Sequence, residues 1–270
     1  MMGDKQIILF TLLIGIVILS GCETLYIPNA VHSPMLTNKG EGHVSTSLGC
    51  IGTGLANVDA AYAVTDHFGI MADGMFHYKT SSYDDYNYQS DMRETVIYYG
   101  SIGMGYFEKM GTKGNFALQF YGGGGYGDSR SFLNSDASIE SDVTANYYDF
   151  YAQPGMVLNT KYIDFGFDVR MKYVQMYNFK SYVFDPGFND EYNYSSDYTR
   201  EFALVEPNFT LLVGGKHLKG KLQSGFTIPI VNGQGYFDSN SGDFYLDSVF
   251  KLNMGITYVF GRKEPVKVKF

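Results

Sequence analysis

The stretch FKLNMGITYVF, residues 250–260, alternates between two kinds of side chain along its whole length. Successive side chains of an extended chain point to opposite sides, so this stretch has one apolar face and one mostly small or polar face. Soluble strands are typically about 5–6 residues long, whereas a tilted strand that crosses a membrane needs about 9–11. The stretch therefore predicts a membrane-crossing strand. Its apolar face carries Phe250, Leu252, Met254, Ile256, Tyr258 and Phe260.

The same alternation recurs along the chain, and it is most informative in residues 163–173. Two acids and two bases share one face there, while the opposite face has no polar group besides the Tyr173 hydroxyl. Such a strand fits between lipid and a polar lumen, and it also fits a strand with one face in water. We predict ten strands, over residues 42–51, 55–64, 68–78, 94–107, 115–127, 146–158, 162–176, 201–213, 220–231 and 247–260.

The predicted connections differ in length between the two ends of the strands. The turns on one side are short, whereas all but one of the loops on the other side are long. Short periplasmic turns and long external loops are typical of outer-membrane barrels, as are aromatic residues at the strand ends. We predict the short turns near 65–67, 108–114, 159–161 and 214–219, and the loops near 52–54, 79–93, 128–145, 177–200 and 232–246.

Over residues 42–260 the chain resembles the small outer-membrane β-barrel proteins. The resemblance implies an all-β fold, a transmembrane antiparallel up-and-down β-barrel of ten strands, with eight to twelve permitted. A soluble barrel or sandwich attached to a lipid is the alternative. An even number of strands would leave both termini on the periplasmic side and the long loops outside the cell.

Residues 7–19 form an unbroken apolar run behind Lys5. The run suits a signal-peptide core because it is shorter than the ~20 residues that a spanning helix needs. It ends in Leu19-Ser20-Gly21-Cys22, which resembles the lipobox of bacterial lipoproteins. The resemblance implies cleavage before Cys22, a diacylglycerol thioether on its thiol and an acyl chain on its amine. An ordinary signal peptide with a chance cysteine, or an uncleaved anchor, is the alternative.

The resemblance divides the chain into four parts. Residues 1–21 would be a lipoprotein signal peptide, and residues 22–41 a lipidated periplasmic lead-in on or inside the periplasmic mouth of the barrel. The barrel itself would cover residues 42–260, followed by a basic tail over 261–270. The segment from Tyr26 to Glu41 is similar to the lead-in of barrel lipoproteins from Bacteroidota.

Charged side chains on the polar faces of the predicted strands would point into the lumen. Charges removed from water must pair and hydrogen-bond or stay hydrated. Because a ten-strand barrel is only a little wider than one filled by side chains, we expect a charge network that closes most of the lumen. A narrow water-filled pore is the alternative. The network would comprise Asp59, Asp73, Asp149, Asp164, Asp168, Arg170, Lys172, Glu206, Lys221 and Lys251.

The sequence offers little to carry catalysis. A net charge of -8 argues against a nucleic-acid partner, because nothing would neutralise a run of phosphates. Asp73 and His77 share a strand face, but they are ~13 Å apart along it, too far for a direct acid–base pair. We therefore predict no catalytic residue, no metal and no cofactor besides the lipid on Cys22. The histidines show no metal-ligand spacing; they are His32, His43, His67, His77 and His217.

These observations predict a non-enzymatic outer-membrane β-barrel lipoprotein. It would be a structural or accessory subunit of an outer-membrane assembly, or a surface-binding barrel. Its partners would be outer-membrane lipid and other outer-membrane proteins. The alternatives are a narrow pore for ions or small solutes, and a hydrolase located at the rim that uses His77.

Overall fold

The strands of the protein are antiparallel and arranged in one sheet in the computed structural model. The model describes residues 25–84, 90–110, 115–135, 140–185, 190–196, 199–231 and 249–262. Within these ranges, no helix is long and apolar enough to cross a bilayer. The strands are β1 (Gly42–Ile51), β2 (Ala56–Ala63), β3 (Phe68–Asp84), β4 (Ser90–Met110), β5 (Phe116–Ser135), β6 (Glu140–Asn159), β7 (Ile163–Asp185), β8 (Asp190–Ser196), β9 (Arg200–Gly214), β10 (Leu218–Val231) and β11 (Val249–Phe260).

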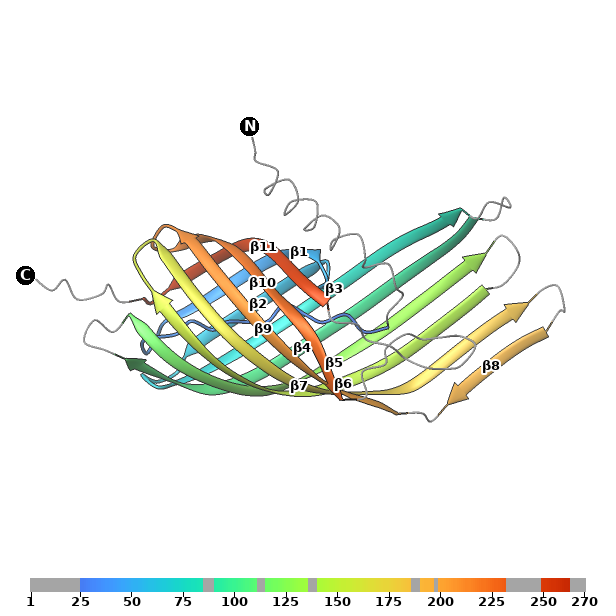
Figure 1. The fold of residues 1–270 in the computed structure, drawn as a ribbon, viewed down its shortest axis with the longest axis horizontal. Helices are drawn as coiled ribbons and strands as arrows, with labels where there is room; N and C mark the ends of the chain where they lie inside the picture. Colours follow the sequence, from blue (N-terminus) through green and yellow to red (C-terminus); the bar gives the residue numbers. More distant parts are fainter. Residues whose placement is uncertain are drawn as a thin grey trace, which may run out of the picture.

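Ten of these strands close into a barrel (Figure 1). From β1 to β7 and from β9 to β11, consecutive strands pair with each other; β7 pairs with β9, and the β1–β11 pairing joins the first strand to the last. Among the described residues, the short strand β8 pairs only with the outer part of β7, from Phe179 to Asp185, and stands outside the closed ring. The predicted ten-strand antiparallel barrel is therefore confirmed.

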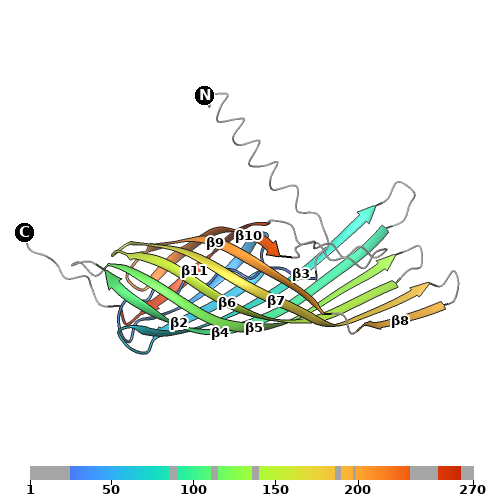
Figure 2. The ribbon, with the colours of Figure 1, turned by 60° about the horizontal axis from the view of Figure 1, so that its bottom comes forward.

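Three hairpins are much longer than predicted. The β3–β4 pairing continues to Asp84 and Ser90, and the β5–β6 and β7–β8 hairpins also project beyond the barrel on the same side (Figure 2). The prediction that residues 79–93, 128–145 and 177–200 are mostly loop was wrong. In the sequence of these stretches, polar residues stand at both odd and even positions, so the apolar alternation disappears although the backbone pairing continues. We call this side the long-hairpin end and the opposite side the short-turn end.

The barrel carries apolar side chains outside and polar side chains inside. Leu48, Ile102 and Phe150 on the outer face are each more than three-fifths exposed. Soluble monomers rarely expose apolar patches larger than a few hundred Å², whereas a membrane barrel needs an apolar belt toward lipid. This inside-out distribution distinguishes the transmembrane barrel from the soluble alternative.

The segment before β1 runs through the interior of the barrel. We name residues 25–39 the lumen segment; in Figure 1 it is the dark blue trace that crosses between the walls. Tyr26, Val31 and Leu36 are almost fully buried within it. The prediction placed this stretch on or inside the periplasmic mouth, but it occupies the length of the lumen instead.

The path of the lumen segment also determines at which end of the barrel the described chain begins. The described chain begins beside the projecting hairpins and ends at Arg262, at the short-turn end, where the lumen segment also finishes. The prediction that both termini lie on the periplasmic side concerns chain ends outside the described residues, whereas Leu25 and Arg262, the first and last described residues, lie at opposite ends of the barrel. The ten strands do return the chain to its starting side, but the lumen segment adds one more passage through the barrel.

Candidate functional site

The lumen segment is irregular, and the wall satisfies its backbone. Proline has no N–H and cannot continue a strand ladder, and Pro28 and Pro34 both lie in this segment. Wall side chains take the place of a neighbouring strand. Gln153 Nε2 donates to the His32 carbonyl at 2.6 Å, and Asn159 Nδ2 donates to the Met35 carbonyl at 3.0 Å. Further contacts join Gln223 to the Val31 carbonyl and the Ala30 N–H to Asn57 Oδ1.

The Asn29 side chain joins the segment to charged groups of both signs. Its Nδ2 donates to Asp73 Oδ1 at 2.6 Å, and its Oδ1 accepts from Arg170 Nη2 at 2.9 Å. Lys172 Nζ donates to the same oxygen at 3.1 Å. A carboxamide is suited to this position because it both donates and accepts without adding charge. Asn29 therefore fixes the segment in the centre of the lumen.

Paired charges surround this point. Glu206 accepts from Arg170 Nε at 2.6 Å and from Lys251 Nζ at 2.6 Å, and Thr227 Oγ1 donates to it at 3.0 Å. Lys172 Nζ lies 2.9 Å from Asp149 Oδ2. These side chains are almost completely buried, where an unpaired charge would be strongly destabilising.

A second group of ion pairs lies toward the short-turn end. Lys221 Nζ donates to Asp59 Oδ1 at 2.7 Å, and Lys219 Nζ donates to Asp164 Oδ2 at 2.7 Å. Arg262 reaches the same Asp164 oxygen at 2.6 Å and also pairs with Glu41. Burial alone would lower the pKa of the Arg262 guanidinium, but the Glu41 and Asp164 carboxylates raise it above its ordinary value.

All ten sequence-predicted charges therefore lie on the inner face, and most of them pair. Asp73 is only partly buried and accepts hydrogen bonds from Asn29 and Ser101. Asp168 is buried and accepts from Gln119 Nε2 at 2.7 Å; the described residues contain no ion pair to it. Glu41, Lys219 and Arg262 also belong to these ion pairs, but the sequence did not mark them as inner residues because they fall just outside the predicted strands.

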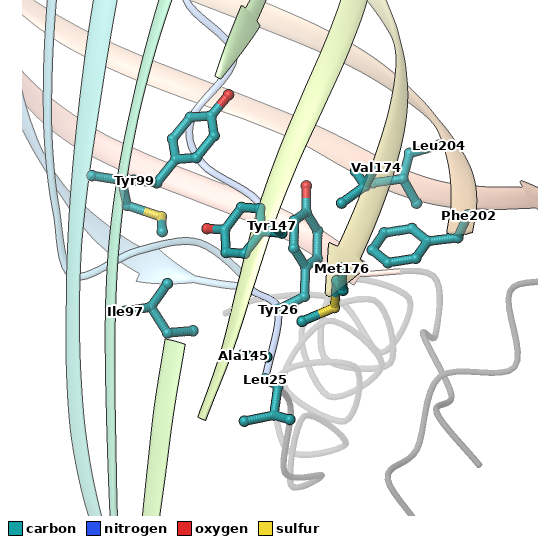
Figure 3. Close-up of a cluster of buried hydrophobic side chains, with 11 residues drawn as sticks. Leu25, Tyr26, Ile97, Tyr99, Ala145, Tyr147, Val174, Met176, Phe202 and Leu204 are labelled. Atoms are coloured by element: carbon teal, nitrogen blue, oxygen red, sulfur yellow. The ribbon is translucent and has the colours of Figure 1, made fainter. Parts of the chain in front are cut away.

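Apolar side chains close the lumen at the long-hairpin end (Figure 3). Tyr26 contacts Tyr147 and Phe202 edge-to-face, with ring centroids 5.3 and 5.1 Å apart. Such ring pairs contribute about 0.5–1.5 kcal/mol beyond the area that they bury. We name this group the mouth cluster: Leu25, Tyr26, Met75, Ile97, Tyr99, Ala145, Tyr147, Val174, Met176, Phe202 and Leu204.

Glycines on β5 make room for the tyrosines of this cluster. A Cβ at Gly125 would collide with the Tyr99 ring, and one at Gly127 would collide with the Tyr147 ring. Near the other end, Leu36 packs among a second group of buried apolar residues that includes Phe107 and Tyr121. The lumen segment is thus covered by apolar side chains on both sides of the charged layer.

The structure brings together three possible metal ligands that the sequence spacing did not indicate. His32 Nε2 lies 2.9 Å from His43 Nε2 and 3.7 Å from Asp59 Oδ1, because the lumen segment places His32 against the wall. However, the Lys221 ammonium already donates to both Asp59 oxygens, at 2.7 and 2.9 Å. A buried ammonium at this position repels a second cation, so the group is better explained as a hydrogen-bonded pair beside an ion pair.

The arrangement around His77 gives no acid–base pair. Both carboxylate oxygens of Asp73 accept hydrogen bonds, one from Asn29 and one from Ser101, at 2.6 Å each. Neither ring nitrogen of His77 has a hydrogen-bond partner among the described residues. Within that part of the chain, nothing activates His77 as a general base.

Comparisons with known proteins bear on the fold. No protein-family model matches the chain, and no curated protein matches it. Among solved structures, the outer membrane protease OmpT from Escherichia coli is similar with a TM-score of 0.51 and 9% identity, over 82% of this chain and 93% of that chain. A major outer membrane protein from Thermus thermophilus is similar with a TM-score of 0.42 and 13% identity, over 82% and 99%. At this identity the likeness to OmpT supports the outer-membrane barrel fold alone.

Proposed function

We propose that this protein is an outer-membrane β-barrel lipoprotein whose lumen is sealed by its own amino-terminal segment. In this proposal Cys22 carries the lipid, the long hairpins face outward, and the protein acts without catalysis as a structural or surface-binding component. The observation that carries the proposal is the lumen segment. It fills the barrel with hydrogen bonds to the wall at its centre and with apolar packing toward both ends.

The filled lumen argues against the narrow pore. A conducting path needs hydrated groups along its length, but the charged side chains around Asn29 are buried and directed at one another. The mouth cluster adds an apolar layer in which an ion would lose its hydration. The lumen of a ten-strand barrel is narrow, so little space is left for water and ions around an inserted chain.

A sealed barrel suits a protein whose working surface is outside the membrane. The long hairpins extend β3 to β7 beyond the barrel, and β8 widens this sheet at one edge (Figure 2). The sequence there is rich in tyrosine and acidic residues, as in residues 83–91 and 190–198. Tyrosine is enriched at protein interfaces. We propose that this projecting sheet binds a protein partner in the outer membrane or at the cell surface.

Planar bilayer recording tests the sealing. Full-length protein should insert without a steady current, whereas a variant that lacks residues 25–37 but keeps Cys22 should conduct. If full-length protein conducts steadily, and Arg170→Gln changes the selectivity of that current, the chain is a pore. Because the deletion variant can fail to fold, Tyr26→Ala provides a milder opening of the mouth cluster.

A separate measurement tests the lipid. Mass spectrometry of the intact mature protein should show an amino terminus at Cys22 with the added mass of diacylglycerol and an acyl chain. An unmodified Cys22, or a chain that still carries residues 1–21, would contradict this part of the proposal and leave the sealed barrel unaffected.

A further inference from the structure

The lumen segment has a definite direction. Tyr26 lies in the mouth cluster, at the level where β1 and β2 end and the long hairpins continue. At the other end of the segment, Asn38 Oδ1 accepts from Lys109 Nζ at 2.9 Å and the Lys39 N–H donates to Asp66 Oδ1 at 3.1 Å, beside the turn between β2 and β3. The chain therefore enters the barrel at the long-hairpin end and leaves it at the short-turn end.

The reach of the chain limits where Cys22 can lie. Only Glu23 and Thr24 separate Cys22 from Leu25, and the three residue-to-residue steps between them span at most ~11 Å when fully extended. Strand β1 has 10 residues, which is about 33 Å along the strand and roughly 25 Å along the axis of a tilted barrel. Cys22 cannot reach the short-turn end by passing back through the lumen, because the lumen segment already fills it.

We propose that Cys22 leaves the barrel at the long-hairpin end, so that its lipid enters the outer leaflet at the cell surface. The inference rests on the lipidation and the orientation in the proposed function. It adds the end of the barrel from which Cys22 emerges and the leaflet of the outer membrane that its lipid enters. Each buried CH₂ of an acyl chain contributes ~0.8 kcal/mol, so chains that emerge at this face insert into the nearest lipid rather than stay in water.

The shape of the rim provides a route to that lipid. The wall is low at the β1–β2 hairpin, where the strands end at Ile51 and Ala56, and high where β3 and β4 continue to Asp84 and Ser90. Acyl chains on Cys22 can enter the bilayer over the low side without crossing the projecting sheet. The tether would then hold the amino terminus at the mouth, next to the surface that we propose for partner binding.

The arrangement also requires a particular order of assembly. The β1–β11 pairing closes the barrel around the lumen segment, and a lipidated end cannot be drawn through the apolar clusters afterwards. The barrel must therefore close after the lumen segment is in place. The lipidated end then reaches the cell surface together with the barrel as the barrel inserts.

Surface labelling of intact cells tests the exit side. In a Cys50→Ser background, the Glu23→Cys variant has one free thiol if Cys22 is lipidated. A membrane-impermeant maleimide should label this thiol on intact cells. The matched control, Lys267→Cys in the basic tail, should react only after the outer membrane is permeabilised.

Two outcomes of this experiment are informative in opposite directions. Labelling of Glu23→Cys on intact cells, with Lys267→Cys protected, supports the exit at the surface. If Glu23→Cys reacts only after permeabilisation, like the control, the inference is overturned. A short epitope inserted between Thr24 and Leu25 and probed with antibody gives the same answer if Glu23→Cys is not exported. The bilayer currents and the mass of Cys22 remain separate tests of the proposed function.

Discussion

The lumen segment is held by different contacts at two levels. Around Asn29 the contacts are directional hydrogen bonds to charged side chains of the wall. Around Tyr26, nearer the long-hairpin end, they are edge-to-face rings and aliphatic packing. Hydrogen bonds need particular partners in particular places, whereas apolar packing mainly excludes water. The central level therefore fixes the position of the segment, and the mouth cluster makes the seal.

Glu206→Gln should have the largest effect on stability, at the central level. The substitution keeps the shape of the side chain but leaves Arg170 and Lys251 buried without their carboxylate. Removal of one partner of a buried ion pair typically costs about 3–5 kcal/mol. Urea unfolding in detergent micelles, followed by circular dichroism because the chain has no tryptophan, should show this loss. An unchanged unfolding midpoint would mean that the network is hydrated.

Tyr26→Ala should have a comparable effect on stability and the largest effect on sealing. Truncation of a buried aromatic residue typically costs about 3–5 kcal/mol. Because Tyr26 fills the mouth cluster, its loss should also raise the leak current in planar bilayers. Tyr98→Ala is the matched control, since Tyr98 is 56% exposed on the outer face. If both variants stay silent, the mouth cluster is not the seal.

Asn29→Ala should destabilise without opening the barrel. Loss of the carboxamide removes hydrogen bonds to Asp73, Arg170 and Lys172, and a buried polar group left without a partner costs about 1–3 kcal/mol. The mouth cluster is intact in this variant, so bilayer recordings should remain silent. A current as large as that of Tyr26→Ala would show that the two levels do not have separate roles.

Asp142→Asn should have the smallest effect. It breaks the contact of Asp142 with Arg130 on the β5–β6 hairpin, where Arg130 is largely exposed. Exposed ion pairs contribute about 0–1 kcal/mol, so the urea midpoint should barely move. A loss comparable to that of Glu206→Gln would contradict the distinction between buried and exposed pairs on which the larger predictions depend.

The alternation of side chains was sufficient to predict the barrel but not its projecting hairpins. Residues 250–260 and 163–173 have one face toward lipid, so every second residue there is apolar and the strand can be recognised in the sequence. In residues 79–84, polar residues stand at both odd and even positions of the sequence, so the alternation stops although strand β3 continues. An alternation of apolar and polar residues therefore cannot predict how far the barrel strands continue beyond the apolar belt.

The inner charges could be predicted for the same reason, whereas the lumen segment could not. Asp59 and Glu206 stand on faces opposite apolar ones, and that alone assigns them to the lumen. The lumen segment has no period, because it is irregular and its contacts are with side chains of strands far away in sequence. The proximity of His32 and His43 depends on that course, so their spacing in the sequence gave no sign of it.

Photo-crosslinking tests most directly whether the lumen segment lies inside the barrel in native membranes. A photoreactive amino acid in place of Val31, which is fully buried, should crosslink to peptides of β10 around Gln223 and of β6 around Gln153. The same amino acid in place of Val44, on the outer face, should crosslink to lipid instead. If position 31 yields lipid or periplasmic products and no contact with these strands, the segment does not fill the lumen.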